Sequence, residues 1–207
     1  MHYSLVMRDK ETDSYWSLMS GEALAGELEG ERLVELPVGI KTQWKDWVAE
    51  HPDTLVLSVE GVEHEERNHY EEYFKSDEGF RGSTAEDDRL PTKAPIFSFQ
   101  LDGRPYAVPF SAIESGAAFR AGDEWVFAYR SPGAAIMHST VAFRSKGEGF
   151  EQRDGAWHHL PSGARFDPVA GAFEARAPGV NPLNGFDTFW FNWSMNHPDS
   201  MILAGSE

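Results

Sequence analysis

One string of residues occurs twice in this 207-residue chain and constrains its fold more than any other feature. Both copies follow the template W-x-x-W-x-x-x-H-P-D-[ST]-x-x-L, and matching residues are 146 positions apart, as from position 44 to position 190. Tryptophan occupies only 7 of the 207 positions, so two tryptophan pairs in register with the same triplet indicate a duplication. The matching pairs are Trp44 and Trp190, Trp47 and Trp193, His51 and His197, Pro52 and Pro198, Asp53 and Asp199, Thr54 and Ser200, and Leu57 and Leu203. A duplicated unit predicts two similar lobes that share one core.

The template predicts a short helix that ends in a turn and continues into a strand. Two tryptophans three residues apart lie on one side of a helix, so both pairs are expected in the core. Proline ends the helix, and Asp with Ser or Thr can satisfy backbone groups in the turn. In this structural interpretation the repeated His and Asp need no catalytic role. The functional alternative is a pseudo-symmetric site between the two halves, formed by His51, Asp53, His197 and Asp199.

A weaker echo precedes each copy. Residues 9–16 resemble residues 167–174 at an offset of 158, which places Tyr15 opposite Phe173. In the first of these segments, Arg8 and Asp9 are expected to take part in a buried ion pair and turn hydrogen bonds, and contact between Arg8 and a ligand is the alternative.

Alternation of apolar and polar residues predicts many short strands and few helices, and therefore an α+β, β-rich fold. Strands are expected at 3–8, 15–19, 54–59, 125–129 and 136–143; hairpins at 96–110 and 150–160; a helix at about 43–50 capped by Thr42; and a long loop at 76–95. We interpret the chain as a single domain over 1–207, with repeat 1 at about 3–60, a connecting hairpin region at about 61–124, and repeat 2 at about 125–204.

The charge balance excludes several partners. The 18 Lys and Arg against 34 Asp and Glu give a net charge of −16, which argues against binding to nucleic acid phosphates. This acidity fits adaptation to high salt, an ordinary acidic cytosolic protein, or cation binding by clustered carboxylates. No apolar run reaches the ~18 residues of a membrane span. The start lacks the pattern of a signal peptide, which predicts a cytoplasmic protein.

Few motifs point to chemistry. The chain has no Cys, and hence no thiolate metal site or Cys nucleophile. His64 and His69 are five apart, so they do not share a helix face as zincin ligands do. No phosphate-binding glycine motif and no G-x-S-x-G occurs. His138 lies in a predicted strand, and Met195 with His197 fits copper only weakly, so no metal site and no cofactor are predicted.

Several long segments resemble one known family, the domain of unknown function family 3179. They are Leu5 to Trp16, Gly21 to Gly26, Trp44 to Thr54, Asn68 to Phe74, Asp88 to Lys93, and Phe189 to Ser200. Longer members of that family carry a C-P-x-C segment upstream of the L-V-M-x-D motif, and many are extracytoplasmic. Because this chain contains no Cys, the resemblance transfers no thiol-based role to it.

We therefore expect a non-enzymatic binding or scaffold domain whose partner is an unidentified small molecule or protein. The first alternative is an enzyme, with or without a metal, that uses a His and carboxylate site between the repeats. The second is a subunit of a larger assembly, including a homo-oligomer, with an exposed apolar face. The candidate ligand-binding residues are Arg8, Asp9, His51, Asp53, His138, His197 and Asp199.

Overall fold

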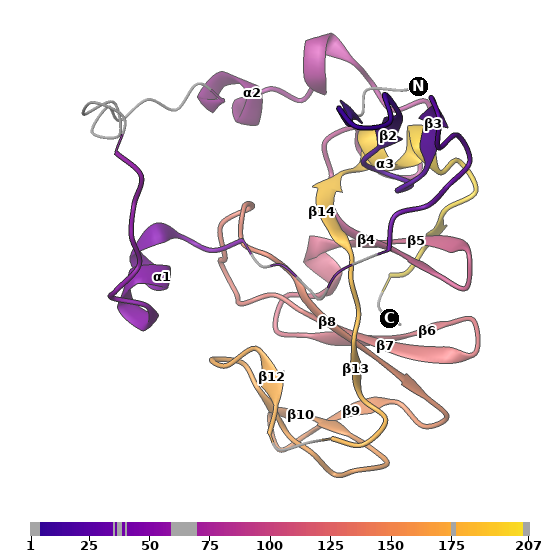
Figure 1. The fold of residues 1–207 in the computed structure, drawn as a ribbon. Coiled ribbons are helices and arrows are strands. Elements are labelled where there is room, and N and C mark those ends of the chain that lie inside the picture. Colours follow the sequence, from indigo (N-terminus) through magenta and orange to yellow (C-terminus); the bar gives the residue numbers. More distant parts are fainter. Residues whose placement is uncertain are drawn as a thin grey trace.

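The structure is a computed structural model that describes residues 5–34, 36, 39, 41–58, 70–174 and 177–204. It has many short strands and few helices, which confirms a β-rich fold. Two four-stranded sheets form the centre of the molecule (Figure 1). The first has the order β14-β4-β5-β15, with β14 at Phe186–Phe189, β4 at Pro95–Leu101, β5 at Arg104–Pro109 and β15 at Met201–Ile202. The second has the order β13-β8-β7-β6, with β13 at Asn181–Pro182, β8 at Val141–Lys146, β7 at Glu124–Tyr129 and β6 at Ala117–Ala121.

The remaining elements surround these two sheets. A three-stranded sheet comprises β1 at Val6–Arg8, β2 at Tyr15–Ser17 and β3 at Ala23–Ala25. Two further hairpins comprise β9 at Phe150–Arg153 with β10 at Ala156–His159, and β11 at Phe166–Asp167 with β12 at Ala172–Phe173. The helices are α1 at Trp44–Glu50, α2 at Glu71–Lys75 and α3 at Trp190–Asn196, with 3-10 turns at Phe80–Gly82 and Phe110–Ala112.

The core has layers because strand β4 is buried on both faces. Its residues alternate, as side chains do along any strand, so Phe97 and Phe99 point to one side and Ile96 to the other. Phe97 and Phe99 pack with Phe119 and Val126 in the cluster between the two four-stranded sheets. Ile96 belongs instead to the cluster beneath α3. The far face of the second sheet packs on the β9–β10 and β11–β12 hairpins through an aromatic cluster around residue 127.

Helices α1 and α2 lie outside these layers, α1 at the left and α2 at the top in Figure 1. None of the seven residues of α1 is buried, whereas α3 buries four of its seven. The expectation that both tryptophan pairs anchor one core is therefore wrong for the first pair.

Both expected hairpins form where turn residues require them. The hairpin β4–β5 turns at Asp102 and Gly103, and β9–β10 turns at Asp154 and Gly155, all four with positive φ. Two expected strands are corrected. Residues 54–58 form no strand because nothing in the described chain pairs with them, and β8 begins at Val141 because the preceding residues form a loop. Residue 59 and residues 3–4 of the expected first strand lie outside the described residues.

Helix α1 also starts differently from the prediction. Gln43 takes the N-cap position, without a side-chain hydrogen bond, in place of Thr42. Strand β6 was not predicted, and it adds an edge to the second sheet by pairing with β7.

Candidate functional site

The two copies of the repeated string fold into the same local structure, and we call residues 44–57 the α1 unit and residues 190–203 the α3 unit. Each helix ends at a histidine with similar dihedral angles, φ −128° and ψ 67° for His51 and φ −137° and ψ 71° for His197. Each histidine amide donates a 2.8 Å hydrogen bond to the carbonyl of the second tryptophan of its helix. The two rings of each pair also lie together, with centroids 4.1 Å apart in both units.

The hydrogen bonds of the turn match as well. The indole of Trp47 donates to Thr54 Oγ1 at 2.9 Å, and the indole of Trp193 donates to Ser200 Oγ at 2.7 Å. In both units the backbone amide of the hydroxyl residue donates to the histidine carbonyl, at 3.1 Å and 3.0 Å. The template residues therefore have structural partners inside their own unit.

The weaker echo corresponds to two hairpins in the same register. Arg8 lies opposite Tyr15 in the β1–β2 hairpin, and Phe166 lies opposite Phe173 in the β11–β12 hairpin. The first turn is stabilised by Asp9, whose carboxylate accepts from the amide and hydroxyl of Thr12 and the indole of Trp16. These bonds lower the pKa of Asp9 to about 2, the Trp16 hydrogen bond having the largest effect.

The surroundings of the two units differ sharply. Trp190 and Trp193 are fully buried beneath the first four-stranded sheet. In the α1 unit, Trp44 is 52% exposed, and the segment that follows the turn is open to solvent. The exposed fractions there are 95% for Leu55, 60% for Val56 and 85% for Leu57. The apolar side chains of this unit are thus accessible from outside the molecule.

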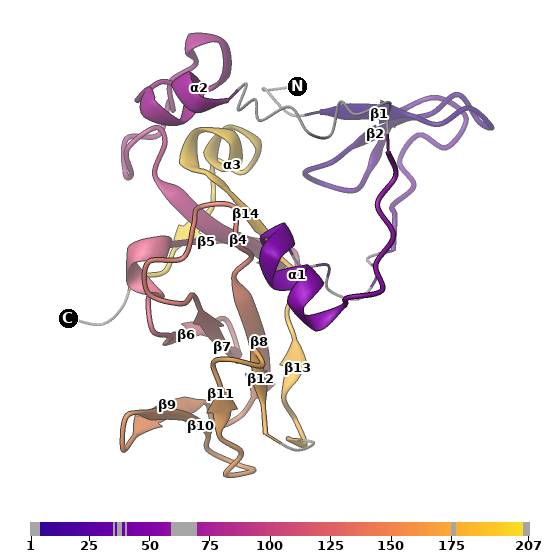
Figure 2. The same cartoon turned by 90° about the vertical axis from the view of Figure 1, so that its left-hand side faces the viewer.

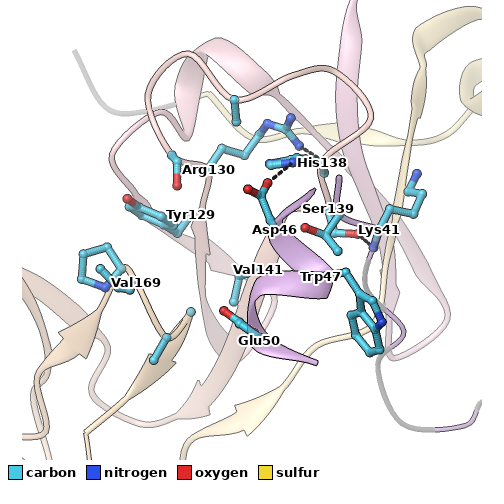
Figure 3. Close-up of a pocket in the computed structure, with 16 residues that line it drawn as sticks. Lys41, Asp46, Trp47, Glu50, Tyr129, Arg130, His138, Ser139, Val141 and Val169 are labelled. Carbon is cyan, nitrogen blue, oxygen red and sulfur yellow. Dashed lines mark hydrogen bonds and ion pairs between the residues drawn. The ribbon is translucent and has the colours of Figure 1, made fainter. Parts of the chain in front are cut away.

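The α1 unit is attached to the rest of the molecule through its acidic face. Asp46 and Glu50 are four residues apart, and they point toward the second sheet beside Tyr129 and His138 (Figure 3). Asp46 Oδ2 lies 3.8 Å from His138 Nε2. Just before the helix, Lys41 and Ser139 exchange two hydrogen bonds, from the Lys41 amide to Ser139 Oγ and from the Ser139 amide to the Lys41 carbonyl.

A cavity of about 240 Å³ lies between α1, the end of β7, the loop 131–139 and the β11–β12 turn. Its charged side chains have both signs, because Asp46 and Glu50 face it together with Lys41 and Arg130. Ligand sites in proteins are usually about 300–1,000 Å³. The cavity could therefore hold only a small ligand.

Arg130 fixes the loop that forms one wall of this cavity. Its guanidinium donates to the carbonyls of His138 at 2.6 Å and Ala135 at 2.9 Å, and it lies 3.7 Å from the ring centre of Phe110. Asp187 lies 3.8 Å away and accepts two hydrogen bonds from Thr140, at 2.6 Å and 2.7 Å. Burial lowers the pKa of Arg130, and the carboxylates of Asp187 and Glu114 oppose this shift.

The structure separates the residues that the sequence suggested as a site. His51 and Asp53 follow α1, whereas His197 and Asp199 follow α3, and the two helices lie apart in both views (Figures 1 and 2). Arg8 pairs with Asp13, and both side chains are more than half exposed, so the expected buried ion pair is an exposed one. Among the candidate ligand-binding residues that the sequence suggested, only His138 lines the cavity beneath α1. In the part of the chain that the structure describes, no three His, Asp or Glu residues are arranged to hold a metal ion.

Sequence reasoning missed the Arg130–Asp187 pair and the buried histidine of β10. Arg130 follows a predicted strand, but its partner is 57 positions away, and no local pattern indicates that pairing. His159 is the buried histidine of β10. It lies between two hydroxyls, with Nε2 2.8 Å from Ser145 Oγ and Nδ1 2.8 Å from Ser162 Oγ.

Comparison with known proteins places this fold in a family. A family model described as "Protein of unknown function (DUF3179)" matches residues 1–200. The chain belongs to the DUF3179 family. Neither the curated proteins nor the solved structures include a match to it. Within the described part of this DUF3179 chain, no helix has the length and apolar character needed to cross a membrane.

Proposed function

We propose that this DUF3179 protein is a non-enzymatic binding or scaffold domain that binds a protein partner through its α1 unit. The observation that supports this function is the exposure of Trp44 and of the three apolar residues at 55–57, which follow the turn. Large exposed apolar patches on otherwise polar proteins commonly mark interaction sites. Tryptophan in particular is enriched among the residues that dominate binding energy.

We also propose that the chain contains two degenerate repeats, with repeat 1 at about 3–60 and repeat 2 at about 125–204. The support is the matching geometry of the two hairpins and of the two helix-turn units. In this proposal both units descend from one docking element, and only the second has its docking surface within the described chain.

A photo-crosslinking residue at position 57 tests the binding function in the cells that make the protein. Position 169 is the matched control, because Val169 is 92% exposed and apolar but lies in the β11–β12 turn. We expect one discrete crosslinked protein from position 57 and none from position 169.

The identified partner, once purified, should bind the intact chain directly. Trp44→Ala with Leu57→Asp should weaken this binding by at least about tenfold, as loss of a central aromatic contact does, whereas Val169→Asp should not. Equal crosslinking at positions 57 and 169 would contradict the proposed function. So would an unchanged binding affinity in the variant that carries the two α1 substitutions.

One observation favours an enzyme as the second candidate: the approach of His138 to Asp46 at the cavity wall. A His and carboxylate pair beside a cavity is a common arrangement for proton transfer. Elemental analysis of protein purified without chelator, followed by the same analysis of His138→Ala, tests the metal-dependent form of this candidate. Stoichiometric metal that is lost in the variant would support it, and metal retained by the variant would place the ion elsewhere.

A further inference from the structure

The α3 unit shows what surface this kind of unit docks on. After its turn, β15 pairs in parallel with β5, with Met201 opposite Tyr106 and Ile202 opposite Ala107. The amide of Leu203 extends the pairing by donating to the carbonyl of Ala107 at 2.9 Å. The unit therefore adds a strand to the edge of a sheet and places its two tryptophans on the face of that sheet.

The same surface satisfies the start of the helix. The first amides of any helix have no partner within it. In α3, the amide of Trp190 donates to the carbonyl of Ala94 at 3.0 Å, and the amide of Phe191 donates to the carbonyl of Thr92 at 2.9 Å. Both acceptors lie just before β4, so residues 92–109 together supply the helix cap, the sheet face and the strand edge.

An arginine completes the docking surface of the α3 unit. The guanidinium of Arg89 lies 5.4 Å from the ring centre of Trp190 and donates to the carbonyl of Ser200 at 2.9 Å. Asp87 holds this guanidinium through a 2.6 Å hydrogen bond, and its own carbonyl accepts from the Trp190 indole at 2.8 Å. One cation thus contacts both the first tryptophan and the turn.

Each of these external contacts is missing from the α1 unit within the described residues. No strand there pairs with residues 55–57, and no hydrogen bond is found for the amides of Trp44 and Lys45. No cation of the described chain lies over the ring of Trp44, which corresponds to Trp190. The internal structure of the unit is retained, whereas its docking contacts are absent from the described part of the chain.

We propose that the partner of the α1 unit is the free edge of a β-sheet in a different polypeptide, which pairs with residues 55–57 and places an arginine over Trp44. This inference rests on the proposed function and specifies the chemistry of its partner. The carboxylate of Asp53 lies in the same turn, in a chain of net charge −16, so a basic edge is electrostatically complementary.

In a second copy of this chain, the sheet edge that receives the α3 unit is not free. Its β5 is already paired with its own β15. Exchange of the two units is disfavoured because Lys45 corresponds to Phe191, which is 4% exposed and packs against Gly79. An exchanged α1 unit would bury the Lys45 ammonium at that position, and burial of an unpaired charge is costly. The partner sheet must therefore leave the position that faces Lys45 open or acidic.

A set of chimeras of the full chain tests whether the α1 unit can dock on a sheet edge. Residues 190–203 are replaced by a second copy of residues 44–57, and the original α1 unit is left in place. The second chimera also carries Lys45→Phe in the transplanted copy, which removes the lysine that would otherwise be buried at the position of Phe191. The control chimera carries Lys45→Phe together with Leu55→Asp and Leu57→Asp in that copy. A fourth adds Arg89→Ala to the second.

We expect the Lys45→Phe chimera to unfold cooperatively, with a thermal midpoint at least about 5 °C above that of the control. The Arg89→Ala addition should lower that midpoint, and unmodified Lys45 should lower it as well. If the Lys45→Phe chimera is no more stable than the control, the sheet-edge proposal is overturned. Such a failure is separate from failure of the proposed function, because crosslinking at position 57 would still report a partner that binds in another way.

Discussion

Trp47 and Trp193 hold the same place in two matching turns, yet Trp193 is fully buried and Trp47 is partly exposed at the edge of the molecule. Both indoles donate to a hydroxyl seven residues later, so the difference between them lies outside their own turns. Local sequence determines the turn, and the presence of a receiving sheet determines how far the ring is buried.

Alanine substitution should separate the two tryptophans. Trp193→Ala is expected to lower the free energy of unfolding by about 3–5 kcal/mol, because it removes a large aromatic ring from the core. Trp44→Ala should change it by no more than about 0.5 kcal/mol, as is usual at exposed positions. For Trp47→Ala, we expect a loss in the free energy of unfolding between those of the other two variants. Urea unfolding followed by far-UV circular dichroism measures all three, and equal losses at Trp44 and Trp193 would show that the α1 unit is not exposed.

The Arg130–Asp187 pair should be far more important for stability than the Arg8–Asp13 pair. The side chains of the first pair are 3% and 6% exposed, so Asp187→Ala leaves a buried guanidinium without its carboxylate. We expect a loss of about 3–5 kcal/mol, as for other broken buried pairs. Asp13→Ala is the matched control at an exposed pair and should cost no more than about 1 kcal/mol.

The variants Asp187→Ala and Asp13→Ala can also be compared by amide hydrogen exchange in the loop that forms the cavity wall. If Asp187→Ala loosens the loop 131–139, amide hydrogen exchange at the amide of Thr140, which donates to Asp187, should accelerate in that variant and not in Asp13→Ala. Unchanged exchange would mean that Arg130 holds the loop without its carboxylate.

Stability should fall as the solution is acidified below the usual histidine pKa. Burial lowers the pKa of both His159 and His197 from the ordinary value of 6.5, and Asp199 partly opposes the shift at His197. The folded state therefore favours the neutral rings, and the unfolded chain binds more protons in this range. The stabilisation is fully present above about pH 6.5 and is lost as the pH falls toward the lowered values.

Urea unfolding between about pH 8 and pH 5 measures this dependence. His159→Gln and His197→Gln should each flatten part of the slope. A slope that is identical in the parent and in both variants would show that these rings do not cause it.

Two glycines of the N-terminal sheet should respond differently to alanine, although both have positive φ. A Cβ on Gly26, at φ +104°, would lie 2.5 Å from the Cα of Ser14, whereas a Cβ on Gly30, at φ +86°, would meet nothing within 4 Å. Both variants carry backbone strain of about 1–2 kcal/mol. Gly26→Ala adds a clash with backbone and should unfold at a clearly lower temperature in calorimetry. Similar midpoints would indicate that the hairpin can move aside.

Much of the fold follows from local patterns in the sequence. Asp102-Gly103 and Asp154-Gly155 predict hairpins because these residues tolerate positive φ, and the tryptophan spacing predicts α1 and α3. The sequence-based prediction failed where contacts with residues far away in the chain determine the local structure. Residues 54–58 have a strand-like sequence but no described neighbour to pair with, and the loop before Val141 is held by Arg130. No spacing rule indicates such contacts.

The candidate site was predicted less well for a related reason. The repeat identified the α1 unit, and its residues do form one structure, but the sequence could not indicate which of the two copies is exposed. The sequence suggested His51 and His197 as candidate ligand-binding residues, but in the structure each ring packs on the second tryptophan of its own unit. Exposure depends on what the rest of the chain covers, and that requires the three-dimensional arrangement.

Because β4 is buried on both faces, insertions and deletions within this strand should be poorly tolerated. Ile96 faces one layer and Phe97 the other, so deletion of a single residue within β4 would turn the remaining side chains of that strand to the opposite layer. Both packing surfaces would then be mismatched at once. Length variation in this part of the coding sequence should consequently be confined to the tip around Asp102 and Gly103, and the strand itself should accept exchanges of residue type far more readily than changes of length.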